Sequence, residues 1–132
     1  MTSGQHYAEF TLLSRITKVG VVVQSAAGRI LDTFCAGDDE SWAYDVYHGG
    51  CLKTQRDGDV KDIAWVGQDS ANRGDRIGLL LDLGDGSIVV YKNDIRLGTM
   101  APPGTIRGPV CWYVYGESGG CGAKIEAKPV PR

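Results

Sequence analysis

Short apolar runs separated by turn residues are the feature that most constrains the fold of this chain. A turn signal recurs about every ten residues, and 19 glycines are many for a chain of 132 residues. Glycine adopts the positive φ angles of tight turns more readily than other residues do. No segment carries an apolar stripe with helical spacing for more than two turns. The pattern therefore predicts an all-β fold, a two-layer antiparallel β-sandwich.

Alternation of apolar and polar residues marks the first predicted strand, at residues 6–13. Ala8 and Phe10 share one of its faces, and Tyr7 and Glu9 share the other. Because the two faces of a strand point to opposite sides of its sheet, the apolar face is expected to lie in the core.

A β-hairpin is predicted around the turn Gly84-Asp85-Gly86, because β-rich runs at residues 76–83 and 87–92 flank it. A second hairpin continues through Asn93-Asp94. Further strands are predicted at residues 18–24, 40–47, 51–54, 63–66, 95–99, 109–116 and 122–128.

The length fits one domain that buries a core of its own. We expect this domain to span residues 5–128 and to be monomeric in isolation. Residues 1–4 are small and polar, as in a disordered or vector-derived end, and residues 129–132 form a short tail that contains Pro129 and Pro131.

The charge balance argues against two classes of partner. The formal net charge is −2, whereas a nucleic-acid binder usually shows a basic surplus. No run of 18 apolar residues is present, and the first residues contain no signal-peptide core. We therefore expect an intracellular protein that binds neither nucleic acid nor membrane.

The sequence offers little material for catalysis. His6 opens a predicted strand and His48 precedes two glycines at a turn, and neither belongs to a nucleophile motif. The acidic run 38–40 displays too few oxygen ligands for a calcium cage, and no zinc-ligand spacing occurs. The glycine-rich segment 116–122 lacks the lysine of a phosphate-binding loop. The chain is therefore expected not to be an enzyme and to need no cofactor or metal.

Several segments, in order, resemble the SPRY domain family over residues 5–128. They are QHYAEF at 5–10, SWAYD at 41–45, GDRIGLLLDL at 74–83, GSI at 86–88, YKN at 91–93, LG at 97–98, GPV at 108–110 and AKIE at 123–126. The segment 74–83 is the most specific of them. Two positions depart from the family pattern, because Ala43 and Asp94 stand where glycine is usual. Asp tolerates the left-handed conformation better than most residues, so the turn at Asp94 is expected to form.

The resemblance implies a module that binds short peptides or protein surfaces through loops at one end of the sandwich. Such domains occur in substrate adaptors of ubiquitin ligases, in Ran-binding proteins and in ryanodine receptors. By resemblance to the peptide-binding members of the SOCS-box type, the candidate site comprises Tyr115, Gly116, Phe34, Asp38, Ile30 and Leu31. Tyr and Trp suit both cores and binding surfaces, so Tyr115 and Phe34 could instead pack the end of the sandwich. A lectin-like carbohydrate-binding module is the alternative function.

The cysteine pattern yields a prediction about redox state. Cys35, Cys51, Cys111 and Cys121 form no C-x-x-C pair, and most of them lie in or beside apolar runs, as buried thiols do. Thiol titration of the denatured, unreduced protein should therefore find four free thiols. A count of two or none would assign the protein to an oxidising compartment.

Overall fold

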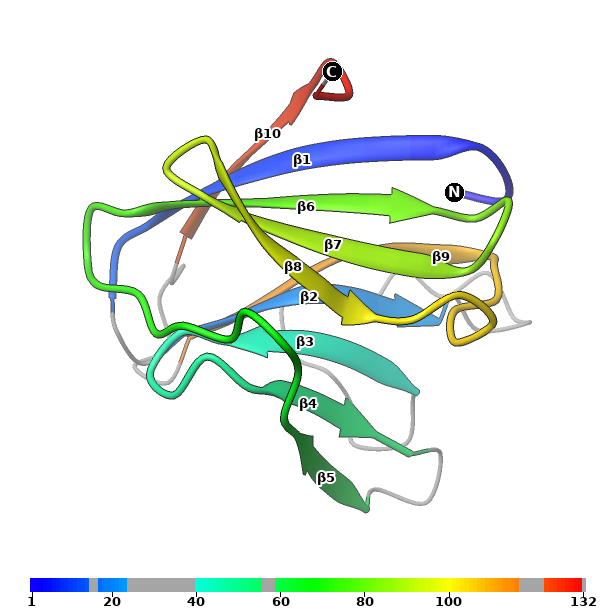
Figure 1. Cartoon of the computed structure of the whole chain (residues 1–132), viewed down its shortest axis with the longest axis horizontal. Helices are drawn as coiled ribbons and strands as arrows, with labels where there is room; N and C mark the ends of the chain where they lie inside the picture. The colour runs from blue at the N-terminus through cyan, green and yellow to red at the C-terminus, as the bar shows by residue number, and fades with distance from the viewer. Residues whose placement is uncertain (15–16, 24–39, 56–58, 117–122, 132) are drawn as a thin grey trace.

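The computed structural model describes residues 1–14, 17–23, 40–55, 59–116 and 123–131. Within them the chain forms two five-stranded sheets, ordered β10-β1-β6-β7-β8 and β5-β4-β3-β2-β9, which lie face to face (Figure 1). The strands are β1 (Gln5–Leu12), β2 (Thr17–Val23), β3 (Ser41–Asp45), β4 (Cys51–Thr54), β5 (Val60–Ile63), β6 (Arg76–Asp82), β7 (Ser87–Lys92), β8 (Ile95–Ala101), β9 (Val110–Gly116) and β10 (Ala123–Lys128). All eight pairings between neighbouring strands are antiparallel. The predicted two-layer β-sandwich is confirmed.

The core lies between the inner faces of the two sheets. In the first sheet, Ala8 and Phe10 of β1 are fully buried, as their alternation predicts. The ring of Phe10 meets that of Trp112 from the second sheet edge to face, with centroids 5.9 Å apart. Residues from both sheets complete the core, among them Val19, Val21, Tyr44, Ile77, Leu79, Leu81, Ile88 and Val90.

The hairpin of β6 and β7 forms where it was predicted. The strands pair from Ile77 with Lys92 to Asp82 with Ser87. In the turn, the backbone N–H of Gly84 donates to Oδ1 of Asp82 over 2.8 Å. This side-chain acceptor stabilises the reversal of the chain.

The next turn, from β7 to β8, has the left-handed backbone that its sequence allows. Asn93 and Asp94 have φ angles of 49° and 71°. Positive φ at both central residues matches the right-handed twist of a hairpin, and Asn and Asp tolerate it best after glycine. Asp94 therefore occupies this turn in place of the glycine that is usual in the family pattern.

One predicted strand is wrong. The run at residues 63–66 was expected to be extended, but β5 ends at Ile63 and a turn includes Val66 and Gly67. The indole N–H of Trp65 donates to the carbonyl of Gly49 over 2.8 Å. Val66 is 92% exposed. The apolar residues that suggested a strand therefore belong to a loop.

The N-terminal residues lie against the sandwich. The first residues, expected to be a disordered or vector-derived end, include Met1, whose ammonium donates to the carbonyl of Val110 over 2.8 Å. The carbonyl of Gly4 accepts from the N–H of Leu83 over 2.9 Å. No helix that could cross a membrane occurs in the described part of the chain.

The contact between Phe10 and Trp112 yields a stability prediction. Trp112→Ala should lower the free energy of unfolding by about 3 kcal/mol, because it leaves a void between the sheets. Tyr115→Ala should cost less, since Tyr115 lies on the outer face of the same strand. Urea unfolding of both variants measures the difference. Equal losses would mean that β9 does not present Trp112 to the core.

Candidate functional site

Tyr115 lies near the end of β9, on the outer face of the second sheet. It pairs with Lys18 of β2, and the Lys18 ammonium is 5.2 Å from the centre of its ring. An ammonium at this distance is attracted to the negative face of an aromatic ring. Gly116 ends the strand opposite Thr17. Both predicted site residues therefore lie where β9 approaches one end of the sandwich.

The other four residues of the predicted site, Ile30, Leu31, Phe34 and Asp38, lie outside the described residues. Their grouping with Tyr115 stays a prediction.

Three described loops meet at the end of the sandwich where Tyr115 lies. They comprise residues 46–50, 64–75 and 93–94 (Figure 1). The strand register places Tyr115 near this end of the sandwich. Lys18 pairs with Tyr115 on one side and, on the other, with Asp45, the last residue of β3 before the loop 46–50.

Hydrogen bonds connect these loops to one another and to the strands. The Lys92 ammonium donates to Oδ2 of Asp69 and to the carbonyl of Ser70, each over 2.9 Å. The Tyr44 hydroxyl donates to the carbonyl of Asp69, and the N–H of Ala71 donates to the carbonyl of Val46. These bonds link the described loops of this end to one another and to the strands that they follow.

Large apolar side chains are nevertheless exposed, Tyr47 and Ile95 at this end and Val66 beside Gly98 in the middle of β8. Val66 is 92% exposed, Ile95 68% and Tyr47 49%. Where exposed apolar side chains form a contiguous patch, they are typical of surfaces that contact another molecule.

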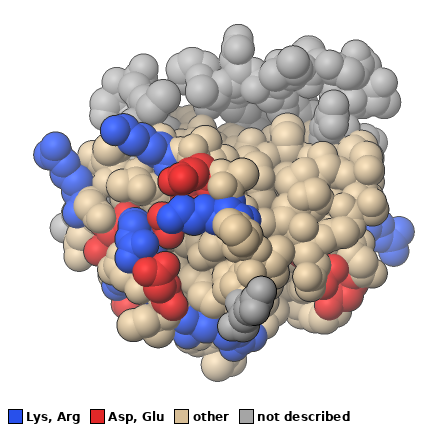
Figure 2. All heavy atoms as spheres, turned by 90° about the horizontal axis from the view of Figure 1, so that it is seen from above, with Lys and Arg blue, Asp and Glu red and all other residues tan. Residues whose placement is uncertain are grey.

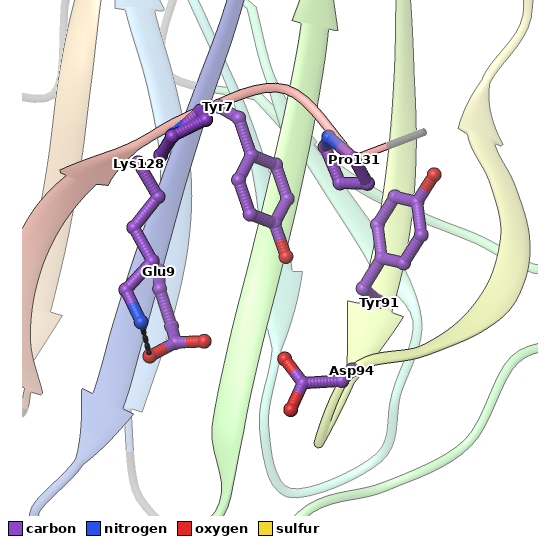
Figure 3. A pocket seen from close by; sticks show the side chains of 7 residues that line it. Tyr7, Glu9, Tyr91, Asp94, Lys128 and Pro131 are labelled. Atoms are coloured by element: carbon purple, nitrogen blue, oxygen red, sulfur yellow. Dashed lines mark ion pairs between the residues drawn. The ribbon is translucent and has the colours of Figure 1, made fainter.

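A pocket of about 240 Å³ opens on the outer face of the other sheet (Figure 3). Two of its lining residues come from β1, one from β7 and one from the turn after β7. The other three come from the end of β10 and the residues that follow it. The lining residues are Tyr7, Glu9, Tyr91, Asp94, Lys128, Pro129 and Pro131.

A glycine in β6 allows the two tyrosines of this pocket to meet. Gly78 pairs with Glu9 on one side and with Tyr91 on the other. A Cβ at Gly78 would overlap the hydroxyl and the ring of Tyr7. Because no side chain is present there, the Tyr7 ring crosses β6 and meets Tyr91 with centroids 5.6 Å apart and ring planes at 84°.

The charged groups of the pocket form a connected network. Glu9, whose side chain is 7% exposed, accepts from Nη1 of Arg76 over 3.3 Å and pairs with Nζ of Lys128 over 3.0 Å. Nη2 of Arg76 continues to Oδ2 of Asp94 over 2.8 Å. From above, positive and negative side chains gather beside one another on one part of the surface, next to a broad uncharged area (Figure 2). The buried Glu9 thus has two cationic partners, as a buried carboxylate requires.

The Tyr7 hydroxyl differs from the other polar groups of the pocket. It makes no hydrogen bond to any residue that the structure describes, although Tyr7 is only 8% exposed. In Figure 3 the hydroxyl points toward the carboxylates of Glu9 and Asp94. Burial, and then the negative charges of Glu9 and Asp94, raise its pKa to about 12, against a smaller opposing effect of Arg76. The phenol is therefore neutral at physiological pH.

The pocket has the groups of a binding site. Glu9 is held in two ion pairs. Among the described residues, no group of three or more His, Cys, Asp and Glu side chains could hold a metal ion. What the pocket offers is aromatic surface, carboxylates and one hydrogen-bonding hydroxyl.

The sequence did not indicate this pocket. The alternation in β1 did predict that Tyr7 and Glu9 share an outer face. Nothing in the sequence, however, indicated that β6, β7 and β10 bring Gly78, Tyr91 and Lys128 beside them.

Comparisons with known proteins identify the fold. No protein-family model and no curated protein matches the chain. The solved SPRY domain of human HERC1 is 20% identical and aligns over 96% of this chain and 76% of that one, with a TM-score of 0.64. The TRIM65 PSpry domain is 16% identical over 98% of this chain and 67% of that one, with a TM-score of 0.62. The chain therefore has the β-sandwich fold of SPRY domains, as the sequence resemblance predicts.

A carbohydrate-binding module has a similar fold. CBM66 from Bacillus subtilis is 11% identical over 97% of this chain and 73% of that one, with a TM-score of 0.55. At such identities the likeness establishes the fold alone.

The raised pKa of Tyr7 yields a prediction about alkaline stability. The folded protein holds this proton more tightly than the unfolded chain, whose tyrosine pKa is near 10.0. The resulting stability is complete below pH 10 and is lost as the pH rises toward 12. Between pH 9 and pH 11 the parent should lose about 1 kcal/mol more than Tyr7→Phe in urea unfolding. All other tyrosines are common to both proteins, so parallel pH profiles would contradict the assignment.

Proposed function

We propose that this chain is an intracellular protein-interaction module. It binds a short peptide or a protein surface through the loops at the end of the sandwich where Tyr115 lies. It does so as the substrate-recognition part of a larger assembly, such as a ubiquitin ligase. The observation that carries the proposal is the set of exposed apolar side chains, Val66 and Tyr47 on loops joined by hydrogen bonds and Ile95 at the start of β8.

Two further facts support binding at this end. The described loops are joined by hydrogen bonds, and such bonds lower the conformational entropy that is lost on binding. Tyr115 presents an aromatic ring beside the Lys18 ammonium on the same end. Aromatic side chains with a polar tip are frequent anchors in interfaces. The overlap with SPRY domains along nearly the whole chain favours the same class of function.

Carbohydrate binding is the second candidate. The similarity to CBM66 and the tyrosine-lined pocket favour it. A sugar that binds only the folded protein would raise the melting temperature. A glycan array and thermal melting with mono- and disaccharides therefore discriminate between the two functions.

Selection of peptides from a displayed random library tests the proposal directly. The parent should enrich a consensus peptide with micromolar Kd, because a small loop site buries less area than a standard interface. Tyr115→Ala should weaken that peptide about thirtyfold, because an anchor side chain carries much of the binding energy. Val66→Ser should weaken it about fivefold, because less apolar area is then buried.

Ile125→Ser is the matched control, because Ile125 is 48% exposed on β10, in the first sheet. It should bind as the parent does. Equal affinities of all the variants, each verified as folded, would place the site elsewhere. Failure to enrich any consensus peptide, together with a positive glycan array, would replace the proposal by carbohydrate binding.

A further inference from the structure

The pocket on the outer face of β1, β6 and β7 has aromatic and apolar walls. Tyr7 and Tyr91 meet nearly at a right angle, and Pro131 lies beside them (Figure 3). Walls of this kind suit a flat group that can stack on a tyrosine ring. A guanidinium is planar, weakly hydrated and stacks on aromatic rings more readily than an ammonium does.

The charges in and beside the pocket balance, and its free acceptors favour a ligand that donates hydrogen bonds. Glu9 and Asp94 are acidic, Lys128 is basic, and Arg76, which pairs with both carboxylates, is the second cation. The Lys128 ammonium is already paired with Glu9. An anion entering the pocket would therefore meet two carboxylates and no unpaired ammonium. Burial is the largest cause of the raised pKa of Tyr7, and the charges of Glu9 and Asp94 add to it against a smaller opposing effect of Arg76.

Two acceptors remain for a ligand. Asp94 uses Oδ2 for Arg76, while its Oδ1 accepts no hydrogen bond from the residues that the structure describes. Its side chain is 68% exposed, so a ligand can reach it from solvent. The second acceptor is the Tyr7 hydroxyl, which is directed into the pocket from a side chain more than nine-tenths buried. This hydroxyl has no hydrogen-bond partner among the residues that the structure describes, and it can accept a hydrogen bond from a ligand N–H.

We infer that this pocket binds the arginine side chain of a protein partner. The guanidinium stacks on the tyrosine pair, donates to Oδ1 of Asp94 and donates to the Tyr7 hydroxyl. The inference rests on the proposed function only in that the arginine belongs to a protein. The pocket lies on the outer face of the first sheet, whereas Tyr115 lies on the outer face of the second. The pocket therefore adjoins the loop end at Asp94, in the turn 93–94, and adds a second contact on the outer face of the first sheet.

Titration of the ¹⁵N-labelled chain with Nα-acetyl-arginine amide tests the inference. Amide signals of Gly78, Tyr91 and Asp94 should shift, with an apparent Kd on the order of millimolar, as expected for a ligand of this size. The citrulline analogue has the same shape without the charge, and it should bind at least about tenfold more weakly. The acetyl-lysine amide should bind more weakly than the arginine probe, because an ammonium lacks the planar fork.

Asp94→Asn removes the charge and suits the left-handed backbone of its turn, where φ is 71°. It should weaken the arginine probe about tenfold. The matched control is Asp62→Asn, because Asp62 is an exposed carboxylate on β5 of the other sheet. It should leave binding unchanged. Tyr7→Phe keeps the ring and removes the hydroxyl, and it should weaken binding about threefold.

Three results would overturn the inference: equal binding of the citrulline analogue, equal effects of Asp94→Asn and Asp62→Asn, or larger shifts of the same signals by methyl glycosides. Val66→Ser separates this inference from the proposed function. It should weaken the library-selected peptide while leaving the affinity for the arginine probe unchanged.

Discussion

Each long strand buries one face against the opposite sheet. Only the side chains of its other face are therefore available to bind a partner. In β1 the inward residues Ala8 and Phe10 are fully buried in the core. The alternation that places them there turns Tyr7 and Glu9 outward. A register slip by one residue would send the pocket residues into the core and the core residues into solvent. The contact between Phe10 and Trp112 therefore holds the binding surface in place as well as the fold.

The outer face of the first sheet is less exposed than an outer face usually is. Glu9 is buried there because Arg76 of β6 and Lys128 of β10 approach it from both sides. The ion pairs of Glu9 with Arg76 and with Lys128 therefore link β1 to both of its neighbouring strands, β6 and β10. Burying a carboxylate costs free energy, and its ion pairs offset that cost only when their geometry is good. The network is therefore weak evidence for stability. Its clearer effect is to fix where the carboxylates and the Tyr7 hydroxyl point.

The parts predicted correctly from sequence are those that neighbouring residues determine. The β6–β7 hairpin follows from Gly84-Asp85-Gly86 between two β-rich runs, and alternation predicts the faces of β1. The run at 63–66 was misassigned because apolar residues in a loop look like a short buried strand until Val66 is seen to be exposed. The tyrosine pocket could not be predicted, because it depends on pairing between strands that are distant in sequence. The position of Tyr115 at a strand end followed from the glycine after it, whereas its partners did not.

The overlap between the Tyr7 ring and the position of a Gly78 Cβ has an evolutionary consequence. Any side chain at position 78 would displace the aromatic ring at position 7, while a small residue at position 7 would leave room for one at 78. The two positions therefore should not drift independently among descendants of this sequence. Exchange of glycine for a larger residue should be accompanied by loss of the aromatic residue, so that the pair varies together as a single unit. Lineages that retain both are the ones in which the tyrosine pair persists.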